Sequence, residues 1–278
     1  ELNIALKINP NQAETYYQLG STYGELERHQ EGLPPLRKAI QLKPDYIKAM
    51  YLLGKFNTLL KDYQEAIISL RKVNEFEPGF EETNFLLGKN LLELKQYHEA
   101  LPYLEKAVIE DPQFSQAQYS LGLNLMKVGR NKEAIKPLQL AVTGDPNFAN
   151  AFKQLGEAYQ TLENYPEAIK AFENAISIDP EFTSVYNNLG TIYTFQKKYF
   201  KAINTFKETL RTNPKFENGF FNLGMVYEIL GRYPEAIKTY KALLDMNPNH
   251  KEAMFSLGWV LMDEKRYLEA APILKQAV

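Results

Sequence analysis

The 278-residue chain contains no cysteine, so disulfide bonds and thiolate chemistry are excluded and the redox state of its compartment stays open. Its 32 basic and 34 acidic residues are interspersed and leave a formal net charge of −2. This balance gives no electrostatic reason to bind a nucleic-acid backbone or an anionic membrane. No apolar run approaches the ~20 residues that a membrane-spanning helix needs, and no signal peptide is visible. We therefore expect a soluble protein that neither binds nucleic acid nor inserts into a membrane, with the cytoplasm favoured as its compartment.

Motifs that carry chemistry are also missing. The sequence contains no Gly-rich phosphate loop, no nucleophile elbow and no helix motif with two histidines. The three histidines, His29, His98 and His250, fall in turns of separate segments, too far apart to share a metal. The sequence therefore predicts that the chain is not an enzyme, and it offers no catalytic residue, no metal ligand and no cofactor site.

A strict period of 34 residues runs through the whole chain. Eight prolines keep this spacing without any insertion, namely Pro10, Pro44, Pro78, Pro112, Pro146, Pro180, Pro214 and Pro248. Eight glycines, each preceded by leucine, keep the same step, namely Gly20, Gly54, Gly88, Gly122, Gly156, Gly190, Gly224 and Gly258. A fixed period of this length is typical of stacked supersecondary units.

Each unit is predicted to form two helices. In residues 149–182 one helical stripe at i, i+3, i+4 and i+7 consists of Phe152, Leu155, Gly156 and Tyr159. A second stripe consists of Ala168, Phe172 and Ala175, and Asp179-Pro180 ends that helix. We expect the glycine and the first alanine to be small because the two helices approach closely there.

These residues resemble the pattern of the tetratricopeptide repeat (TPR), in which an aromatic residue, Leu-Gly and Tyr are followed by Ala, Phe and Pro over 34 positions. Departures are mild: Asn84 and Gln118 replace the opening aromatic residue, and the tyrosine is replaced by Asn57, Leu91, Leu125 and Leu261. The resemblance implies an all-α fold, a right-handed superhelical solenoid of antiparallel helix pairs.

The resemblance covers the chain as a single array. Residues 1–12 are expected to be the second helix of a preceding repeat, and residues 251–278 a truncated eighth repeat. The full repeats are predicted at 13–46, 47–80, 81–114, 115–148, 149–182, 183–216 and 217–250. Because both ends fall inside the pattern, we expect the sequence to be a segment of a longer protein.

In TPR proteins the outer face of the first helix lines a concave groove that binds partners, and we interpret its positions here in the same way. In the N-terminal half this face carries Lys48, Lys55 and Lys89 together with the aromatic residues Tyr51, Phe85 and Tyr119. The lysines are candidates to bind an acidic side chain or a C-terminal carboxylate, although exposed lysines are commonly just solvated.

Toward the C-terminus the predicted groove becomes apolar. The candidates at i, i+4 and i+7 spacing are Phe221, Met225, Phe255, Trp259 and Met262. Aromatic residues and methionine make adaptable anchor pockets, and tryptophan is enriched among interface hot spots. The alternative is that Phe221 and Phe255 pack against the neighbouring repeat.

Amide side chains stack in consecutive repeats at Asn188 and Asn222, and they can grip the backbone of an extended peptide. This row partly resembles the asparagine ladder of peptide O-GlcNAc transferases. Lys153 and Asn188 also match two members of the carboxylate clamp of chaperone-binding TPR domains. Glu157 occupies a clamp position and two cations are missing, so that mode of binding is not expected.

The leading interpretation is a protein–protein interaction scaffold that holds a peptide or helical segment of a partner in its groove. One alternative is the substrate-recognition arm of a larger enzyme, for example a protein glycosyltransferase, whose catalytic domain is absent from this sequence. Another is a module for self-assembly.

Self-association can be tested directly. The final helix, 268–278, is expected to expose Leu274 and Ala277, because a terminal repeat has no neighbour to cover its apolar stripe. We predict that the segment associates through its ends at high concentration, as measured by sedimentation equilibrium. A monomer at every concentration would contradict this prediction.

Overall fold

A computed structural model describes residues 11–277, which form sixteen helices, α2–α17, and no strand. None of these helices combines the length and the apolar composition that crossing a membrane requires. Contacts between Cα atoms divide the chain into two compact units, Glu1–Pro146 and Asn147–Val278, and each is described by itself. Most of the helix expected over residues 1–12 lies outside the described residues, and Asn11 and Gln12 form the turn before α2.

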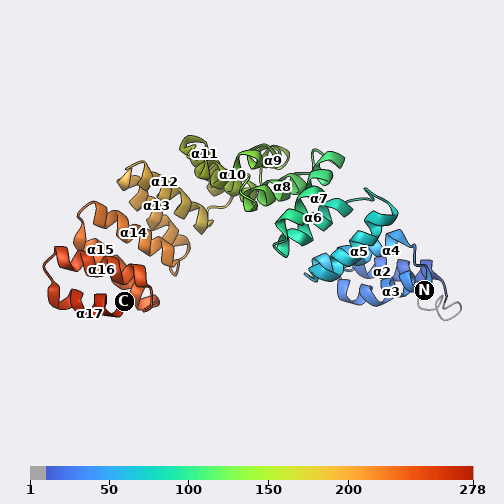
Figure 1. Cartoon of the computed structure of the whole chain (residues 1–278), viewed down its shortest axis with the longest axis horizontal. Coiled ribbons are helices and arrows are strands. Elements are labelled where there is room, and N and C mark those ends of the chain that lie inside the picture. The colour runs from blue at the N-terminus through green and yellow to red at the C-terminus, as the bar shows by residue number, and fades with distance from the viewer. Residues whose placement is uncertain (1–10, 278) are drawn as a thin grey trace. The chain divides into compact units, whose positions relative to one another are not determined.

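Each unit is a succession of four helix pairs, and three residues join the two helices of a pair (Figure 1). The helices of unit 1 are α2 (Ala13–Glu25), α3 (His29–Leu42), α4 (Ile47–Leu59), α5 (Tyr63–Phe76), α6 (Thr83–Glu93), α7 (Tyr97–Glu110), α8 (Ser115–Lys127) and α9 (Asn131–Gly144). Those of unit 2 are α10 (Ala149–Thr161), α11 (Tyr165–Ile178), α12 (Thr183–Phe195), α13 (Tyr199–Thr212), α14 (Glu217–Ile229), α15 (Tyr233–Met246), α16 (Lys251–Asp263) and α17 (Tyr267–Ala277). The fold is therefore the predicted all-α solenoid of paired helices.

The periodic glycines lie where the two helices of a pair approach most closely. A Cβ atom added to Gly54 would lie 2.6 Å from Cγ of Leu70, and one added to Gly156 would lie 2.5 Å from the ring of Phe172. Leu70 and Phe172 are fully buried, so neither side chain can move aside without opening the core. The absence of a side chain at the glycine is thus the condition for this helix packing.

The turn inside each pair has one left-handed residue. Its φ is positive at Gly129 and Gly231, and it is also positive at the equivalent residues of the other six pairs, Glu27, Lys61, Lys95, Glu163, Lys197 and Lys265. Glycine adopts this conformation freely, whereas a residue with a side chain pays a steric cost. The turn geometry is therefore kept by the packing of the pair and not by glycine alone.

The residues exposed on the last helix, α17, are not the ones that the sequence predicted. Ala277, which was expected to be exposed, is 1% exposed, so that expectation is wrong. Leu274 is half-buried against Gly258. Leu268 is instead 95% exposed on α17.

The close approach of the helices generates a stability prediction. Gly156→Ala should lower the midpoint of urea unfolding, because a clash with the Phe172 ring costs about 1–3 kcal/mol and outweighs the gain in helix propensity of about 1 kcal/mol. The matched control is Asn150→Ala, an exposed position on the same helix α10, which should leave the midpoint unchanged or raise it slightly. Circular dichroism at increasing urea measures both, and an equal response of the two variants would contradict the packing argument.

Candidate partner-binding surfaces

The first helices of successive pairs touch one another along each unit. In unit 1 these are α2, α4, α6 and α8, and in unit 2 they are α10, α12, α14 and α16. All candidate residues lie on these helices. We use the name first-helix surface of unit 1 for the surface formed by Lys48, Tyr51, Lys55, Phe85, Lys89 and Tyr119. The first-helix surface of unit 2 is formed in the same way by Lys153, Asn188, Phe221, Asn222, Met225, Phe255, Trp259 and Met262.

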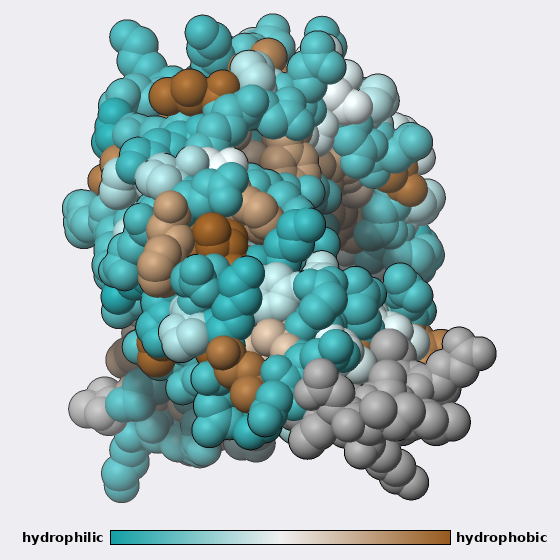
Figure 2. All heavy atoms as spheres, turned by 90° about the vertical axis from the view of Figure 1, so that its right-hand side faces the viewer, coloured by the Kyte–Doolittle hydropathy of each residue, from teal (hydrophilic) through white to brown (hydrophobic). Residues whose placement is uncertain are grey.

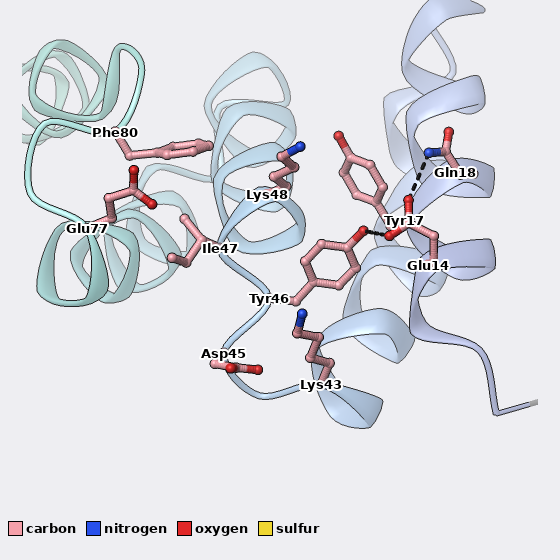
Figure 3. Close-up of a pocket in the computed structure, with 10 residues that line it drawn as sticks. All are labelled: Glu14, Tyr17, Gln18, Lys43, Asp45, Tyr46, Ile47, Lys48, Glu77 and Phe80. Atoms are coloured by element: carbon pink, nitrogen blue, oxygen red, sulfur yellow. Dashed lines mark hydrogen bonds between the residues drawn. The ribbon is translucent and has the colours of Figure 1, made fainter.

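A pocket of about 500 Å³ opens where α2, α4 and the connection before α6 meet (Figure 3). Lys48 is the one candidate that lines it. Its other lining residues are Glu14, Tyr17, Gln18, Lys43, Asp45, Tyr46, Ile47, Glu77 and Phe80. The pocket thus combines two cations, three carboxylates and three aromatic rings, a lining suited to polar contacts.

The carboxylate of Glu14 is held from two sides, as the dashed lines in Figure 3 show. The Tyr46 hydroxyl donates a hydrogen bond to it, and Gln18 Nε2 donates another at 3.0 Å. Both hydrogen bonds lower the pKa of Glu14, and the one from Tyr46 has the larger effect. The positive charges of Lys48 and Lys43 lower this pKa further. Glu14 is therefore ionised at neutral pH, and it offsets part of the positive charge of the pocket.

The other two candidate lysines of unit 1, Lys55 and Lys89, lie over aromatic rings of their own helices. Lys55 Nζ is 5.9 Å from the centroid of Tyr51, and Lys89 Nζ is 5.8 Å from that of Phe85. Tyr51 and Phe85 are buried, at 5% and 7% exposure, and burial is the main cause that raises the pKa of Tyr51. A partner could therefore reach the ammonium groups of Lys55 and Lys89, but little of the Tyr51 and Phe85 rings.

Each of these two rings packs against the phenylalanine that closes its own repeat. Tyr51 meets Phe80 edge-on at 5.5 Å between centroids, and Phe85 meets Phe114 at 4.7 Å. Tyr119 is half-buried on α8. The closing residues Tyr46 and Phe80 also line the pocket of Figure 3, and sequence reasoning missed them there. A signal was available, since the last residue of six of the seven full repeats is phenylalanine or tyrosine.

The surface around these lysines is of mixed charge. Phe85 borders a second, smaller cavity of about 110 Å³ whose other lining includes four acidic residues, Glu81, Glu82, Glu110 and Asp111. Figure 2 shows a face on which hydrophilic residues predominate and hydrophobic ones form small separate patches. The basic character predicted for unit 1 is therefore local to the individual lysines.

A polar network crosses the first-helix surface of unit 2. Asn222 Nδ2 donates to Asn187 Oδ1 at 2.9 Å, and Asn188 Nδ2 donates to Glu157 Oε1 at 3.0 Å. Lys153 Nζ lies 3.5 Å from the same Glu157 oxygen. The carboxylate of Glu157 thus contacts both Asn188 and Lys153, the two residues that match a carboxylate clamp.

An exposed apolar strip continues this surface on α16. We use the name α16 strip for Phe255, Trp259 and Met262, which are 40%, 59% and 37% exposed. Their i, i+4 and i+7 spacing puts them on one side of the helix, while Leu257 and Leu261 anchor its other side in the core. Exposed side chains of this size on one helix face are candidates to contact another molecule.

The neighbouring candidates are less accessible. Phe221 is half-buried, stacks on His250 at 5.5 Å and packs against Tyr240 at 6.1 Å between centroids. Met225 is half-buried on α14. His250 caps α16, because its Nδ1 accepts a hydrogen bond from the Ala253 N–H at 3.3 Å. Among residues 11–277 no group of His, Asp and Glu side chains is arranged to hold a metal ion.

Several solved structures are similar to this chain. YrrB, described as a TPR protein with an unusual peptide-binding site, is 26% identical over 71% of this chain and 97% of its own, with a TM-score of 0.58. MamA is 29% identical over 59% of this chain and 95% of its own, with a TM-score of 0.56. The C-terminal part of a TPR repeat-containing protein from Cytophaga hutchinsonii shares the fold at 15% identity, covering 87% of this chain and 99% of its own, with a TM-score of 0.70. No curated protein is similar enough to be matched.

Family models agree with these comparisons. One tetratricopeptide repeat model matches residues 85–147, 188–242 and 221–278, which is more than half of the chain. A second matches 149–182, and a third matches 13–46 and 47–80. Because one family model matches more than half of the chain and the others match further repeats, the chain belongs to the tetratricopeptide repeat family.

Proposed function

We propose that this protein is an interaction scaffold that binds a segment of a partner protein on the first-helix surface of unit 2. The observation that carries the proposal is the α16 strip, whose three large apolar side chains are exposed on a helix that is otherwise firmly packed. The occupant that fits it is a peptide or helix with apolar anchor side chains. The likeness to YrrB, a TPR protein with a peptide-binding site, supports a peptide as the class of ligand.

Trp259 is the central residue of the α16 strip and the most exposed of its three side chains. Burying an exposed apolar side chain in an interface is favourable in proportion to the area removed from water. Tryptophan combines a large rigid apolar area with one N–H donor, so it adds little conformational cost when it is covered. Phe255 and Met262 on either side can exclude water from the contact.

The polar network beside the strip would orient the bound segment. Each carboxamide can make more than one hydrogen bond, and only one N–H each of Asn188 and Asn222 is committed to a neighbouring repeat. The remaining donors and acceptors suit the backbone of an extended peptide. Apolar anchoring on α16 and backbone contacts on α12 and α14 would together fix the register of the ligand.

In unit 1 we propose a separate, electrostatic contribution. Lys48, Lys55 and Lys89 are exposed, and each could pair with an acidic side chain of a partner. Such contacts on an open surface contribute mainly to the rate of association and weaken as salt is added.

Self-assembly is the alternative that a specific observation favours. Leu268 is 95% exposed on α17 and, in a second copy, could meet an apolar surface such as the α16 strip. A substrate-recognition arm of a larger enzyme would bind its substrate protein on the same surfaces. This alternative is therefore a special case of the proposed binding, in which a catalytic domain modifies the bound protein.

The contribution of Trp259 to binding can be measured with peptides selected from a displayed random library. Trp259→Ala should weaken the selected peptides by about 2 kcal/mol, roughly thirtyfold in Kd, by fluorescence anisotropy. The matched control is Leu268→Ala, which removes a more exposed apolar side chain outside the proposed site and should leave Kd unchanged. If the Trp259→Ala variant bound the peptides as tightly as the unmodified chain, the binding site would lie elsewhere. If the Leu268→Ala variant lost peptide binding and the unmodified chain sedimented in a concentration-dependent way, self-assembly would be favoured.

Trp259 also provides a direct reporter, because it is the only tryptophan in the chain. In the free protein its emission should be that of a solvated indole and should be strongly quenched by acrylamide, since the side chain is 59% exposed. A bound peptide should shift the emission to shorter wavelength and protect it from quenching. Peptide binding by anisotropy with no change in the tryptophan emission would refute the α16 strip as the contact.

A further inference from the structure

The turn between α12 and α13 exposes two phenylalanines and three lysines within residues 195–201. Phe195 is the last residue of α12 and is 66% exposed, and Phe200 is the second residue of α13 and is 74% exposed. Lys197, Lys198 and Lys201 are exposed around them. We use the name basic turn for these five residues, none of which belongs to the first-helix surface of unit 2 or to the α16 strip.

The charge of the basic turn reverses the pattern of the repeat at the third residue of the second helix. This residue is Lys201 in α13. The other seven pairs have glutamate there, namely Glu31, Glu65, Glu99, Glu133, Glu167, Glu235 and Glu269. Within residues 11–277, α13 is accordingly the one second helix whose first turn has no acidic residue. Because the helix dipole favours a carboxylate and disfavours a cation near the N-terminus, Lys201 is unfavourable for α13 itself.

In other pairs the glutamate also neutralises a neighbouring cation. Arg130 Nη2 lies 2.6 Å from Glu133 Oε2. Equivalent ion pairs are Arg28 with Glu31, Arg232 with Glu235, and Arg266 with Glu269. In the basic turn the same two positions are Lys198 and Lys201, whose like charges repel each other. In the described part of the chain none of the three lysines forms an ion pair with a carboxylate, so their charge can pair with an anion from outside.

The two phenylalanines also differ from the neighbouring repeats. The position of Phe200 is occupied by proline in the pairs on either side, at Pro166 and Pro234, and that of Phe195 is occupied by Thr161 in the preceding pair. Both rings keep most of their surface in water, which costs free energy in proportion to the apolar area. Apolar and charged residues that the fold does not require, gathered on one turn, are typical of a contact surface.

The positive charge is confined to this one turn. The preceding turn, whose Tyr165 stacks on Phe195 at 6.4 Å between centroids, carries the exposed carboxylates of Glu163 and Glu167. In the following turn Arg232 is already paired with a glutamate. A flat anionic membrane would bring its headgroups close to the carboxylates of the preceding turn, which would repel them. A short acidic segment of a protein can contact the basic turn alone, and it is therefore the partner that the charges favour.

We propose that the basic turn is a docking site for a short acidic segment of a partner protein. An apolar side chain of the segment covers Phe195 and Phe200, and its carboxylates pair with Lys197, Lys198 and Lys201. Because these lysines are exposed, the contact weakens as salt is added. The site is independent of the proposed peptide binding on the first-helix surface of unit 2.

The test uses a displayed library of random peptides and the full chain with Trp259→Ala, so that the selected peptides do not rely on the α16 strip. Counter-selection uses the same chain with Phe200→Pro and Lys201→Glu, which give the turn the residues of the two neighbouring repeats. Peptides retained by the first chain and not by the second should be acidic and should contain an apolar residue. The absence of such peptides, or retained peptides without net negative charge, would overturn the proposal.

Individual peptides are then measured on the unmodified chain by fluorescence anisotropy. Lys201→Glu should weaken their binding at least about tenfold, because it replaces an attraction by a repulsion. The matched control is Lys207→Glu, which makes the same change of charge at an exposed position of α13 outside the basic turn and should change Kd much less. Equal losses in the two variants would reveal a general effect of net charge and would contradict docking on the turn.

Stability separates a binding role of Lys201 from a structural one. Lys201→Glu should unfold at a higher urea concentration than the unmodified chain, because glutamate suits the first turn of α13 and can pair with Lys198. Weaker peptide binding together with lower stability would mean that Lys201 supports the fold, and the proposal would be wrong. Vesicles of phosphatidylcholine and phosphatidylserine test the other partner. If they bound the chain through this turn while no acidic peptide was selected, the turn would contact a membrane surface instead.

Discussion

In every repeat a glycine of the first helix faces a large side chain of the second helix, and this contact sets the geometry of both units. The large partner is leucine in all four pairs of unit 1, as for Gly20 with Leu36. In unit 2 it is aromatic in three pairs, as for Gly224 with Tyr240. Because no side chain separates the helices at this point, the first helix is held at a constant rotation, and the same positions face outward in each repeat. The first-helix surfaces of the two units, from α4 to α8 and from α10 to α16, are a consequence of this constraint.

This arrangement separates positions that maintain the fold from positions that are free to vary. Lys55 and Trp259 occupy the same register in different repeats, yet one presents a cation and the other an exposed indole. Either substitution leaves the glycine contact untouched, so the surface can change its chemistry without a loss of packing. Asn57 is the opposite case, because it lies at a core position where other repeats have tyrosine or leucine, and its buried carboxamide has no hydrogen-bond partner.

The sequence predicted the candidate surface well where exposure follows from helical spacing alone. Phe255, Trp259 and Met262 lie together on α16 as their i, i+4 and i+7 spacing indicated. It predicted less about Tyr51 and Phe85, because their burial depends on Phe80 and Phe114, which are about thirty residues away in the chain. The role of Glu157 was hidden for the same reason, since Asn188 comes from the next repeat.

The amino-acid sequence by itself determined the repeat, its paired helices and the residues that must be small or large, because each of these follows from a period of 34 residues and from local helix propensity. Only the tertiary structure decided which polar and aromatic side chains find partners. Asn222 Nδ2 donates a hydrogen bond to Asn187 of the preceding repeat, whereas the buried side chain of Asn57 has no hydrogen-bond partner. The physical reason is that hydrogen bonds and ring contacts depend on distances of a few ångströms between residues from different helices, and a sequence pattern specifies only which helix faces meet.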